Sequence, residues 1–285
     1  MSAAGGARLI AITGAASGMG AAAAARLRAA GDTVVGLDRQ AVPGVDVVAD
    51  LSTAEGRAAA VAGVREVAGG RLDGLVLAAG LGPVPGRERT LLEVNLRGAV
   101  ELLQGLRPLL AASERGRAVV LGSNSTTTTP FVGRRVVRTL LDDDLDAALE
   151  RLAKPRNLAA ARCYAASKTA LTHWVRRAAA TPEWAGAGIR LNVLAPGAVA
   201  TPLLQEQLAG KDGDRVRKFP IPAGGPGTPE QLAHWVEILL SDAADFMVGS
   251  VVTVDGGSEA YLRPASWPRS VPTRELPRYL VRLLR

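Results

Sequence analysis

The sequence is poor in cysteine, lysine, histidine and aromatic residues. Its 285 residues include one cysteine, two histidines and 4% aromatic residues. The single cysteine, Cys163, excludes an internal disulfide and fits a reducing compartment, so we expect a cytoplasmic protein. No run approaches about 18 apolar residues, and residues 1–8 lack the charged start and apolar stretch of a signal peptide. Neither a transmembrane helix nor a secretory leader is therefore expected.

Arginine carries nearly all of the positive charge in a chain whose net charge is +7. Apart from those in the C-terminal tail, the basic residues are scattered. Nucleic-acid binding normally needs a basic stripe or a reading motif, so no nucleic-acid partner is expected. The hydrophobic content of 48% excludes disorder throughout the chain and is ample for a large core.

Short apolar runs alternate with helical segments along most of the chain. The apolar runs are residues 8–12, 33–37, 45–49, 72–78, 118–121, 189–194 and 251–254. The helical segments are residues 19–30, 53–68, 90–110, 161–180 and 229–240. Strands that are apolar on both faces indicate a parallel sheet covered on both sides. We therefore predict an α/β protein with one Rossmann-fold domain over residues 1–260, built on a doubly wound seven-stranded parallel sheet.

Three segments lie outside this alternation. Residues 124–160 follow the fifth strand and are predicted to be an insertion with a helix at residues 144–152. Asp142, Asp143 and Asp144 in it could suggest a metal cluster, but carboxylates at a helix N-terminus are better explained as caps, so no metal is expected. Residues 196–227 are rich in Gly and Pro and are predicted to be a substrate loop or lid.

Residues 261–285 form a basic tail rich in Pro and Arg. Leu276, Leu280, Leu283 and Leu284 recur at helical spacing with arginines between them. Such a basic amphipathic stretch can dock on a subunit, fray or lie on a membrane surface. We favour subunit docking, and membrane contact is the least favoured of the three.

A glycine-rich turn lies between the first strand and the first helix. Glycines there let the backbone approach a pyrophosphate, and the helix N-terminus favours its negative charge. The spacing is T-G-x-x-x-G-x-G, which differs from the G-x-G-x-x-G of other dinucleotide-binding folds. The candidate cofactor-binding residues of this turn are Thr13, Gly14, Ser17, Gly18, Met19 and Gly20.

Acidic residues at the next two strand ends complete the candidate cofactor site. Asp38 closes the second strand, where a carboxylate can accept the adenosine ribose hydroxyls and would repel a 2′-phosphate. Arg39 could instead pair with that phosphate, so NADP stays open as the less favoured cofactor. Asp50 and Leu51 end the third strand and are predicted to border the adenine. The expected cofactor is NAD.

Tyr164 and Lys168 are spaced i, i+4 on a predicted helix and therefore share one face. A free phenol has a pKa near 10, whereas an acid/base group works best near ambient pH. We expect the Lys168 ammonium, together with an oxidised nicotinamide, to lower the pKa of Tyr164.

Taken in order, these motifs closely resemble the short-chain dehydrogenase/reductase family over residues 8 to about 260. The resemblance implies Tyr164 as catalytic acid/base, Lys168 as its partner on the nicotinamide ribose, and Ser123 as the hydroxyl that orients the substrate oxygen. It implies Asn95 as a helix-kinking residue that holds a relay water. Further implied cofactor contacts are Ala79, Gly80, Pro196, Gly197, Val199 and Thr201. One departure is Leu77-Ala78-Ala79-Gly80, where the family often has Asn-Asn-Ala-Gly.

Ser123 and Tyr164 are 41 residues apart, whereas the family commonly has about a dozen. With the segment from Ala49 to Arg57, this insertion resembles the bacterial 3α-hydroxysteroid dehydrogenase/carbonyl reductase subgroup. The resemblance implies an NAD(H)-dependent enzyme that interconverts a secondary alcohol and a ketone on a cyclic or bulky apolar substrate, working as a homodimer or homotetramer. A tailoring ketoreductase of a secondary-metabolite pathway shares every one of these residues. A catalytically silent nucleotide-sensing protein is less favoured, because Tyr164 and Lys168 are both present.

Overall fold

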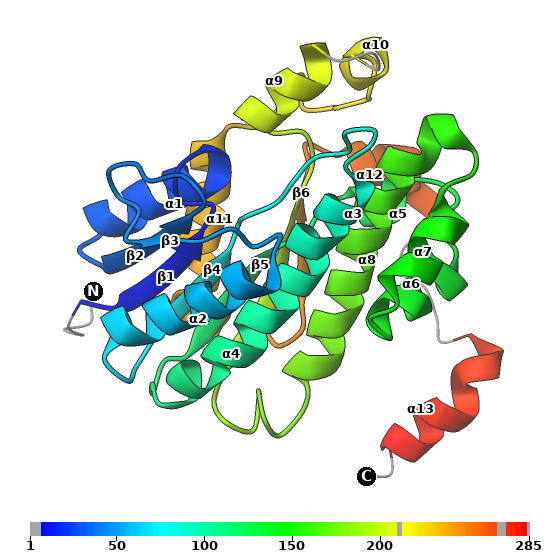
Figure 1. Cartoon of the computed structure of the whole chain (residues 1–285). Helices are drawn as coiled ribbons and strands as arrows, with labels where there is room; N and C mark the ends of the chain where they lie inside the picture. The colour runs from blue at the N-terminus through cyan, green and yellow to red at the C-terminus, as the bar shows by residue number, and fades with distance from the viewer. Residues whose placement is uncertain (1–6, 210–212, 267–271, 284–285) are drawn as a thin grey trace.

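The computed structural model describes residues 7–209, 213–266 and 272–283, and a seven-stranded parallel sheet runs through its centre (Figure 1). The strand order is β3-β2-β1-β4-β5-β6-β7, so the direction of winding reverses beside β1. The strands are β1 Leu9–Thr13, β2 Thr33–Asp38, β3 Val47–Val48, β4 Gly74–Leu77, β5 Arg117–Leu121, β6 Arg190–Pro196 and β7 Val251–Val254. The predicted doubly wound fold is confirmed.

Helices cover both faces of the sheet, as predicted. On one face α1 (Gly18–Ala29) packs against α11 (Pro229–Leu239). On the other lie α2 (Ala54–Ala68), α4 (Ala99–Ala111) and α8 (Ala159–Ala179). Successive strand residues point to opposite faces of the sheet. Ile10 and Ile12 therefore pack into the core on the side of α1 and α11, and Ala11 packs into the core on the side of α2, α4 and α8.

Side-chain caps begin two of the helices where the sequence predicts them. Thr53 Oγ1 accepts the Gly56 N–H at 3.0 Å at the start of α2. Asp144 Oδ1 accepts the Ala147 N–H at 3.0 Å at the start of α7 (Leu145–Leu152). Among the described residues, no group of His, Cys, Asp or Glu side chains is arranged to hold a metal ion. The hydrogen bond to Ala147 shows that Asp144, in the acidic run at residues 142–144, is a helix cap.

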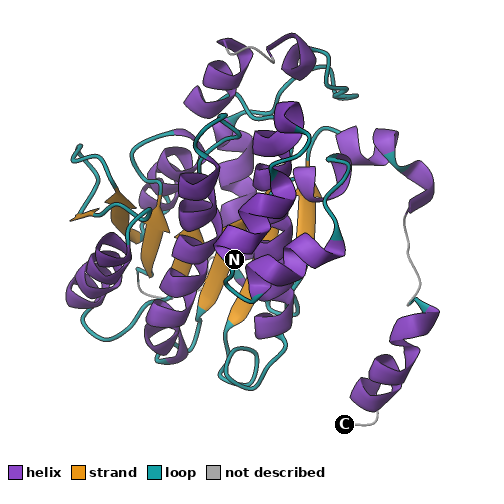
Figure 2. Cartoon of the chain, turned by 45° about the vertical axis from the view of Figure 1, so that its right-hand side comes forward, coloured by secondary structure: helices purple, strands orange, loops and turns teal. Residues whose placement is uncertain are grey.

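The insertion after β5 is more helical than predicted. It holds α5 (Ser125–Thr128), α6 (Arg134–Leu141), α7 and a 3₁₀ turn at Arg156–Leu158. Val136, Val137 and Leu140 of α6 are buried, and α6 packs on α8 (Figure 2). The insertion is thus a helical layer added outside α8.

The segment at residues 196–227 is not the simple loop that its Gly and Pro content predicts. It contains α9 (Pro202–Ala209) and α10 (Gly213–Arg217), which lie together at the top of Figure 1. Leu203 and Gln207 of α9 reach Gly82, where an added Cβ would lie 2.7 Å from Leu203 Cδ1 and 2.9 Å from Gln207 Nε2. Helix α9 thus packs against the loop after β4, a contact that the Gly and Pro content of residues 196–227 does not predict.

The tail forms α12 (Ser258–Leu262), short 3₁₀ turns at Pro264–Ser266 and Thr273–Glu275, and α13 (Leu276–Leu283). Helix α13 lies apart from the sheet and its covering helices in both views (Figures 1 and 2). Leu276, Leu280 and Leu283 are exposed, and Leu284 lies outside the described residues. In the described part of the chain, no helix combines the length and apolar character needed to cross a membrane.

Candidate active site

The glycine-rich turn joins β1 to α1 with no room for side chains. Thr13 Oγ1 accepts the Ala79 N–H at 3.0 Å, which ties the end of β1 to the end of β4. Gly14 has a φ of 72°, and a Cβ there would lie 2.9 Å from the Ala79 N. A Cβ at Gly20 would lie 2.2 Å from the Gly14 O. Both positions require glycine, and the turn stays close to the strand ends.

Helix α1 presents an open N-terminus to this turn. Ser17 is its N-cap residue, but the Ser17 side chain makes no capping hydrogen bond, and the first turn holds no acidic residue. The free N–H groups of a helix N-terminus carry partial positive charge and bind anions well. Together with Gly14, Gly18 and Gly20, they form a cradle that fits the pyrophosphate of a dinucleotide.

Asp38 lies at the rim of the same turn, at the end of β2. Its Oδ2 accepts the Ala16 N–H and its Oδ1 accepts the Gln40 N–H, both at 3.1 Å. These two backbone bonds fix the orientation of the carboxylate. Arg39, the alternative partner for a 2′-phosphate, is exposed beside it.

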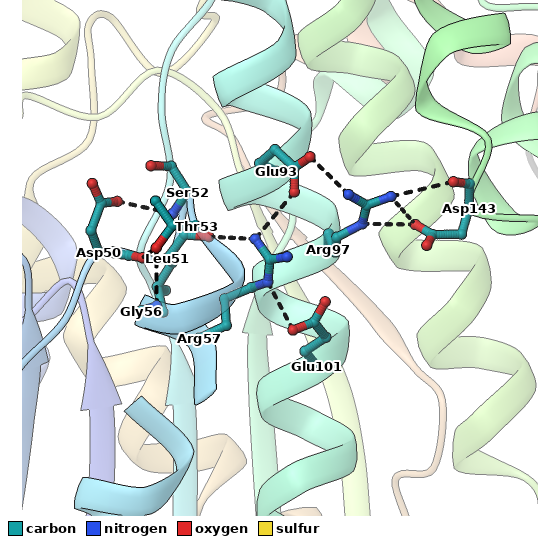
Figure 3. Close-up of polar contacts among 10 residues, drawn as sticks. All are labelled: Asp50, Leu51, Ser52, Thr53, Gly56, Arg57, Glu93, Arg97, Glu101 and Asp143. Carbon is teal, nitrogen blue, oxygen red and sulfur yellow. Dashed lines mark hydrogen bonds and ion pairs between the residues drawn. The ribbon is translucent and has the colours of Figure 1, made fainter. Parts of the chain in front are cut away.

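Asp50 and Leu51 follow β3 and are held by local bonds (Figure 3). Asp50 Oδ1 accepts the Ser52 N–H at 2.9 Å, and hydrogen bonds from Ser52 hold the pKa of the Asp50 carboxyl below its usual value. The Leu51 side chain is buried, and its carbonyl O accepts a hydrogen bond from Arg57 Nη1 at 3.3 Å.

Asn95 lies where the helix on residues 88–111 is distorted. The sequence predicts one helix over residues 90–110, whereas the structure has α3 (Glu88–Leu92), a π-helical turn η1 (Glu93–Gly98) and α4. Asn95 Oδ1 accepts the Leu81 N–H at 2.7 Å, and Asn95 Nδ2 donates to the Leu81 O at 2.9 Å. The helix is thus deformed at Asn95, as the resemblance implies, and the amide holds the chain that follows β4.

Ser123, Tyr164 and Lys168 meet where β5 ends against α8. Lys168 Nζ donates to the Leu121 O at 2.7 Å. The Ser123 side chain lies close enough to Tyr164 to lower the pKa of the phenol. Ser123 Oγ also accepts the Ser125 N–H at 3.1 Å, so this oxygen is oriented by backbone as well as by Tyr164. A Cβ at Gly80 would lie 3.2 Å from Asn95 Oδ1 and 3.6 Å from Lys168 Nζ, so Asn95 shares this corner.

Burial is the main cause of the pKa shifts of Tyr164 and Lys168. Desolvation raises the pKa of Tyr164, and the hydrogen bond from Ser123 acts in the opposite direction. Desolvation also lowers the pKa of Lys168 to about 8. That Lys168 and an oxidised nicotinamide together lower the pKa of Tyr164 stays a prediction, because it concerns the chain with its cofactor bound. The spacing in the sequence places the two groups near each other but does not show how deeply both are buried.

Lys168 is expected to reduce the stability of the fold at neutral pH. Its pKa is about 8 in the folded chain and about 10.5 when unfolded, so between these values the unfolded chain binds more protons and stability rises with pH. We expect Lys168→Met to increase the free energy of unfolding at pH 7 by about 1–3 kcal/mol, after loss of the bond to Leu121. The gain should shrink toward pH 10.

Urea denaturation at pH 7 and pH 10 measures this gain. Lys154→Met is the matched control, because Lys154 is exposed in the insertion and should change stability little at either pH. A Lys168→Met variant that is less stable than the wild type at pH 7 would show that interactions in the folded chain outweigh the cost of burying the ammonium.

The segment after β6 lies between the glycine-rich turn and β7. Thr201 Oγ1 donates to the Val199 O at 3.3 Å, and a Cβ at Gly18 would lie 3.3 Å from Thr201 Cγ2. The N–H of Gly197 donates to the Val254 O at 3.0 Å. Of the predicted contacts Pro196, Gly197, Val199 and Thr201, Thr201 thus lies against the cofactor turn, and Gly197 lies beside the end of β7.

Asn124 is a residue of this corner that the sequence reasoning did not select. Its N–H donates to the Pro196 O at 2.9 Å, and its Nδ2 donates to Asp255 Oδ2 at 3.1 Å. The Asp255 carboxylate also accepts the N–H groups of Gly257 and Glu259. The only signal in the sequence is a polar residue directly after Ser123, and the partner lies 131 positions away.

A relative from Comamonas testosteroni, described as 3-alpha-hydroxysteroid dehydrogenase/carbonyl reductase, is 38% identical over 260 residues, or 91% of this chain and 99% of the relative. The chain belongs to the short-chain dehydrogenase/reductase family. The family model described as short chain dehydrogenase matches residues 8–134. A second model, described as Enoyl-(Acyl carrier protein) reductase, matches residues 148–259. The chain is accordingly an oxidoreductase.

Solved structures of short-chain dehydrogenase/reductases share the fold. The 3-alpha-hydroxysteroid dehydrogenase from Pseudomonas sp. B-0831, solved with NADH, is 40% identical, with a TM-score of 0.83 over 91% of this chain and all of that one. Levodione reductase is 25% identical, with a TM-score of 0.68 over 89% of this chain and 98% of that one. Of these two structures, the hydroxysteroid dehydrogenase, which belongs to the kind of enzyme that the sequence motifs indicate, is the more similar to this chain.

Proposed function

We propose that this chain is an NAD(H)-dependent oxidoreductase that interconverts a secondary alcohol and a ketone on a cyclic or bulky apolar substrate. The observation that carries the proposal is the cluster of Ser123, Tyr164 and Lys168 beside a glycine-rich turn whose rim is Asp38. The Comamonas relative and the NADH complex of the Pseudomonas enzyme support it.

Asp38 selects the cofactor in this proposal. The glycine-rich turn and the N-terminus of α1 hold the pyrophosphate, Asp38 accepts the ribose hydroxyls, and Asp50 and Leu51 border the adenine. The nicotinamide, when bound, supplies hydride acceptance and donation at its C4. The further residues that hold it are Ala79, Gly80, Tyr164, Lys168, Pro196, Gly197, Val199 and Thr201.

The protein's own part of the reaction is proton transfer and positioning. In the oxidising direction the Tyr164 phenolate takes the proton of the substrate hydroxyl. Ser123 Oγ accepts the Ser125 N–H, and in this proposal the Ser123 proton turns from Tyr164 to the substrate oxygen when substrate binds. The Leu121 carbonyl O accepts a hydrogen bond from Lys168 Nζ and so holds it in place. The Lys168 ammonium stabilises the Tyr164 phenolate once it forms. Asn95 positions the backbone at Leu81 and holds a relay water.

The threonines that follow Ser123 favour an apolar substrate. Thr126 Oγ1 donates to the Ser123 O, and the hydroxyls of Thr127 and Thr128 donate to the Asn124 O, all at 3.0 Å. Because these hydroxyls bond their own backbone, they add little polar surface to the substrate side. We propose that a cyclic or bulky apolar alcohol binds between this segment and α9.

Cofactor titration is the first test of the proposal. Purified protein is titrated separately with NADH and NADPH while nicotinamide fluorescence is followed, and we expect clear preference for NADH. A panel of cyclic secondary alcohols with NAD, and of the matching ketones with NADH, then tests turnover. Binding of neither nucleotide would overturn the proposal, whereas preference for NADPH would show that Arg39 outweighs Asp38.

We also propose that the enzyme is a cytoplasmic homodimer or homotetramer in which the tail docks on a neighbouring subunit. Cys163 is free and buried, which suits a reducing compartment. The exposed leucines of α13 give the tail an apolar surface without a partner in the described part of the chain. Light scattering on the full chain and on a chain ending at residue 263 gives the number of subunits in each assembly, and the same number in both would contradict docking.

A further inference from the structure

Arg57 on α2 is a buried cation in a network that the proposed reaction does not use (Figure 3). Its side chain is 5% exposed. A buried charge is strongly unfavourable unless it is paired and its donors are satisfied. Arg57 Nε donates to Glu101 Oε2 at 2.8 Å, and Arg57 Nη1 donates to Glu93 Oε2 at 3.1 Å and to the Leu51 O at 3.3 Å.

The acceptors of Arg57 belong to two parts of the candidate cofactor site. Leu51 lies in the loop after β3, on the adenine side. Glu93 begins the π-helical turn η1, two residues before Asn95, which holds the backbone at Leu81 on the catalytic side. One guanidinium therefore bonds both the adenine-side loop and the turn that carries Asn95.

Direct packing reinforces this bridge. Gly98 ends η1, and a Cβ there would lie 3.3 Å from Leu51 Cβ and 3.4 Å from the Leu51 O. The loop after β3 thus lies against η1 with no room for another atom. The Gly98 backbone thus faces both the side chain and the carbonyl O of Leu51, and Arg57 holds the two segments together, so we expect a shift of one to displace the other.

The ion pairs farther from Arg57 in this network contribute less to holding the segments together. Glu93 Oε1 accepts Arg97 Nη1 at 2.8 Å, and Arg97 Nε donates to Asp143 Oδ1 in the insertion at 2.9 Å. The Asp143 side chain is 69% exposed, and exposed ion pairs contribute about 0–1 kcal/mol. The link to the insertion is therefore weak, and Arg57 is the strong member.

We propose that Arg57 is a positioning residue that couples the adenine-side loop to the turn carrying Asn95, so that both halves of the dinucleotide site are set together. The inference rests on the proposed function for the identity of the ligand. Removing the guanidinium leaves the Leu51 carbonyl O and Glu93 Oε2 without this donor, while Arg97 still holds Glu93 Oε1, and we expect the two segments to move apart from the geometry that holds the cofactor.

The test compares Arg57→Met with Arg65→Met. Arg65 lies on the same helix, and its Nη2 donates to the Gly105 O at 2.7 Å, but it bonds neither segment of the site. Calorimetry measures the Kd for ADP-ribose, which lacks the nicotinamide, and fluorescence measures the Kd for NADH. Arg57→Met should raise both Kd values about tenfold, and Arg65→Met should change them less than about twofold.

Hydrogen exchange tests the coupling without any nucleotide. The Leu81 N–H is protected by its bond to Asn95, so peptides covering residues 78–83 should exchange faster in Arg57→Met than in Arg65→Met. If the wild type binds no nucleotide but peptides 78–83 still exchange faster in Arg57→Met than in Arg65→Met, the coupling is upheld and only the proposed function is refuted. Unchanged exchange at residues 78–83 would overturn the coupling, as would a variant with lower Tm and unchanged Kd.

Glu93→Gln keeps the test decisive if Arg57→Met does not fold. The substitution preserves shape and a hydrogen-bond acceptor but removes the charge that pairs with Arg57. We expect a smaller rise in the Kd for ADP-ribose, about threefold, with faster exchange at residues 78–83. An unchanged Kd and unchanged exchange in this variant would also refute the coupling.

Discussion

Replacing Tyr164 with phenylalanine is expected to reduce kcat for alcohol oxidation by about 10²- to 10⁴-fold, the usual contribution of a positioned acid/base group. The phenylalanine ring retains the packing of the tyrosine but cannot take the hydroxyl proton. Cofactor affinity should change far less than kcat, because the glycine-rich turn and Asp38 are untouched. Steady-state kinetics with NAD and the best alcohol of the panel, together with the Kd for NADH, measure both quantities.

Tyr261→Phe is the matched control for this substitution. Tyr261 lies on α12 and is exposed, so its variant should keep wild-type kcat. Near-full turnover in Tyr164→Phe would refute the assignment of the acid/base.

The pH profile adds a second readout of the same group. Burial raises the pKa of Tyr164, so the phenolate fraction, and with it the oxidation rate, should rise as pH increases through neutrality. The residual activity of Tyr164→Phe should lose this dependence. An unchanged pH profile in the variant would assign the titration to another group.

Replacing Asp38 with alanine is expected to shift the preference between cofactors by about 10²-fold toward NADPH. A carboxylate beside a 2′-phosphate places like charges together, which costs several kcal/mol, and the substitution removes that repulsion. It also leaves Arg39, which is exposed at the same rim, free to pair with the phosphate. The ratio of the Kd values for NADPH and NADH, measured by fluorescence, reports the shift.

Glu55→Gln provides the control for this change in charge. Glu55 is an exposed acid in the first turn of α2, so its substitution should leave the ratio within about twofold. An Asp38→Ala variant that keeps the wild-type ratio would show that selection lies elsewhere in the site.

Much of this protein can be predicted from short stretches of sequence. The strand, glycine turn and helix at residues 8–30, the caps Thr53 and Asp144, and the shared face of Tyr164 and Lys168 depend on residues only a few positions apart. Backbone propensity, capping and helical spacing act over such distances. For that reason the element types and the candidate catalytic residues follow from the sequence, whereas several element boundaries shift by a few residues.

The remainder depends on contacts between distant segments. Arg57 bonds Glu93 and Glu101, which lie 36 and 44 positions away, and Asn124 bonds Asp255 across 131 positions. The burial of Lys168, which lowers its pKa to about 8, depends on such contacts as well. The sequence alone thus determined the family, the sheet and the reacting groups. The tertiary structure decided the burial, long-range ion pairs and π-helical turn, because these depend on which segments pack together.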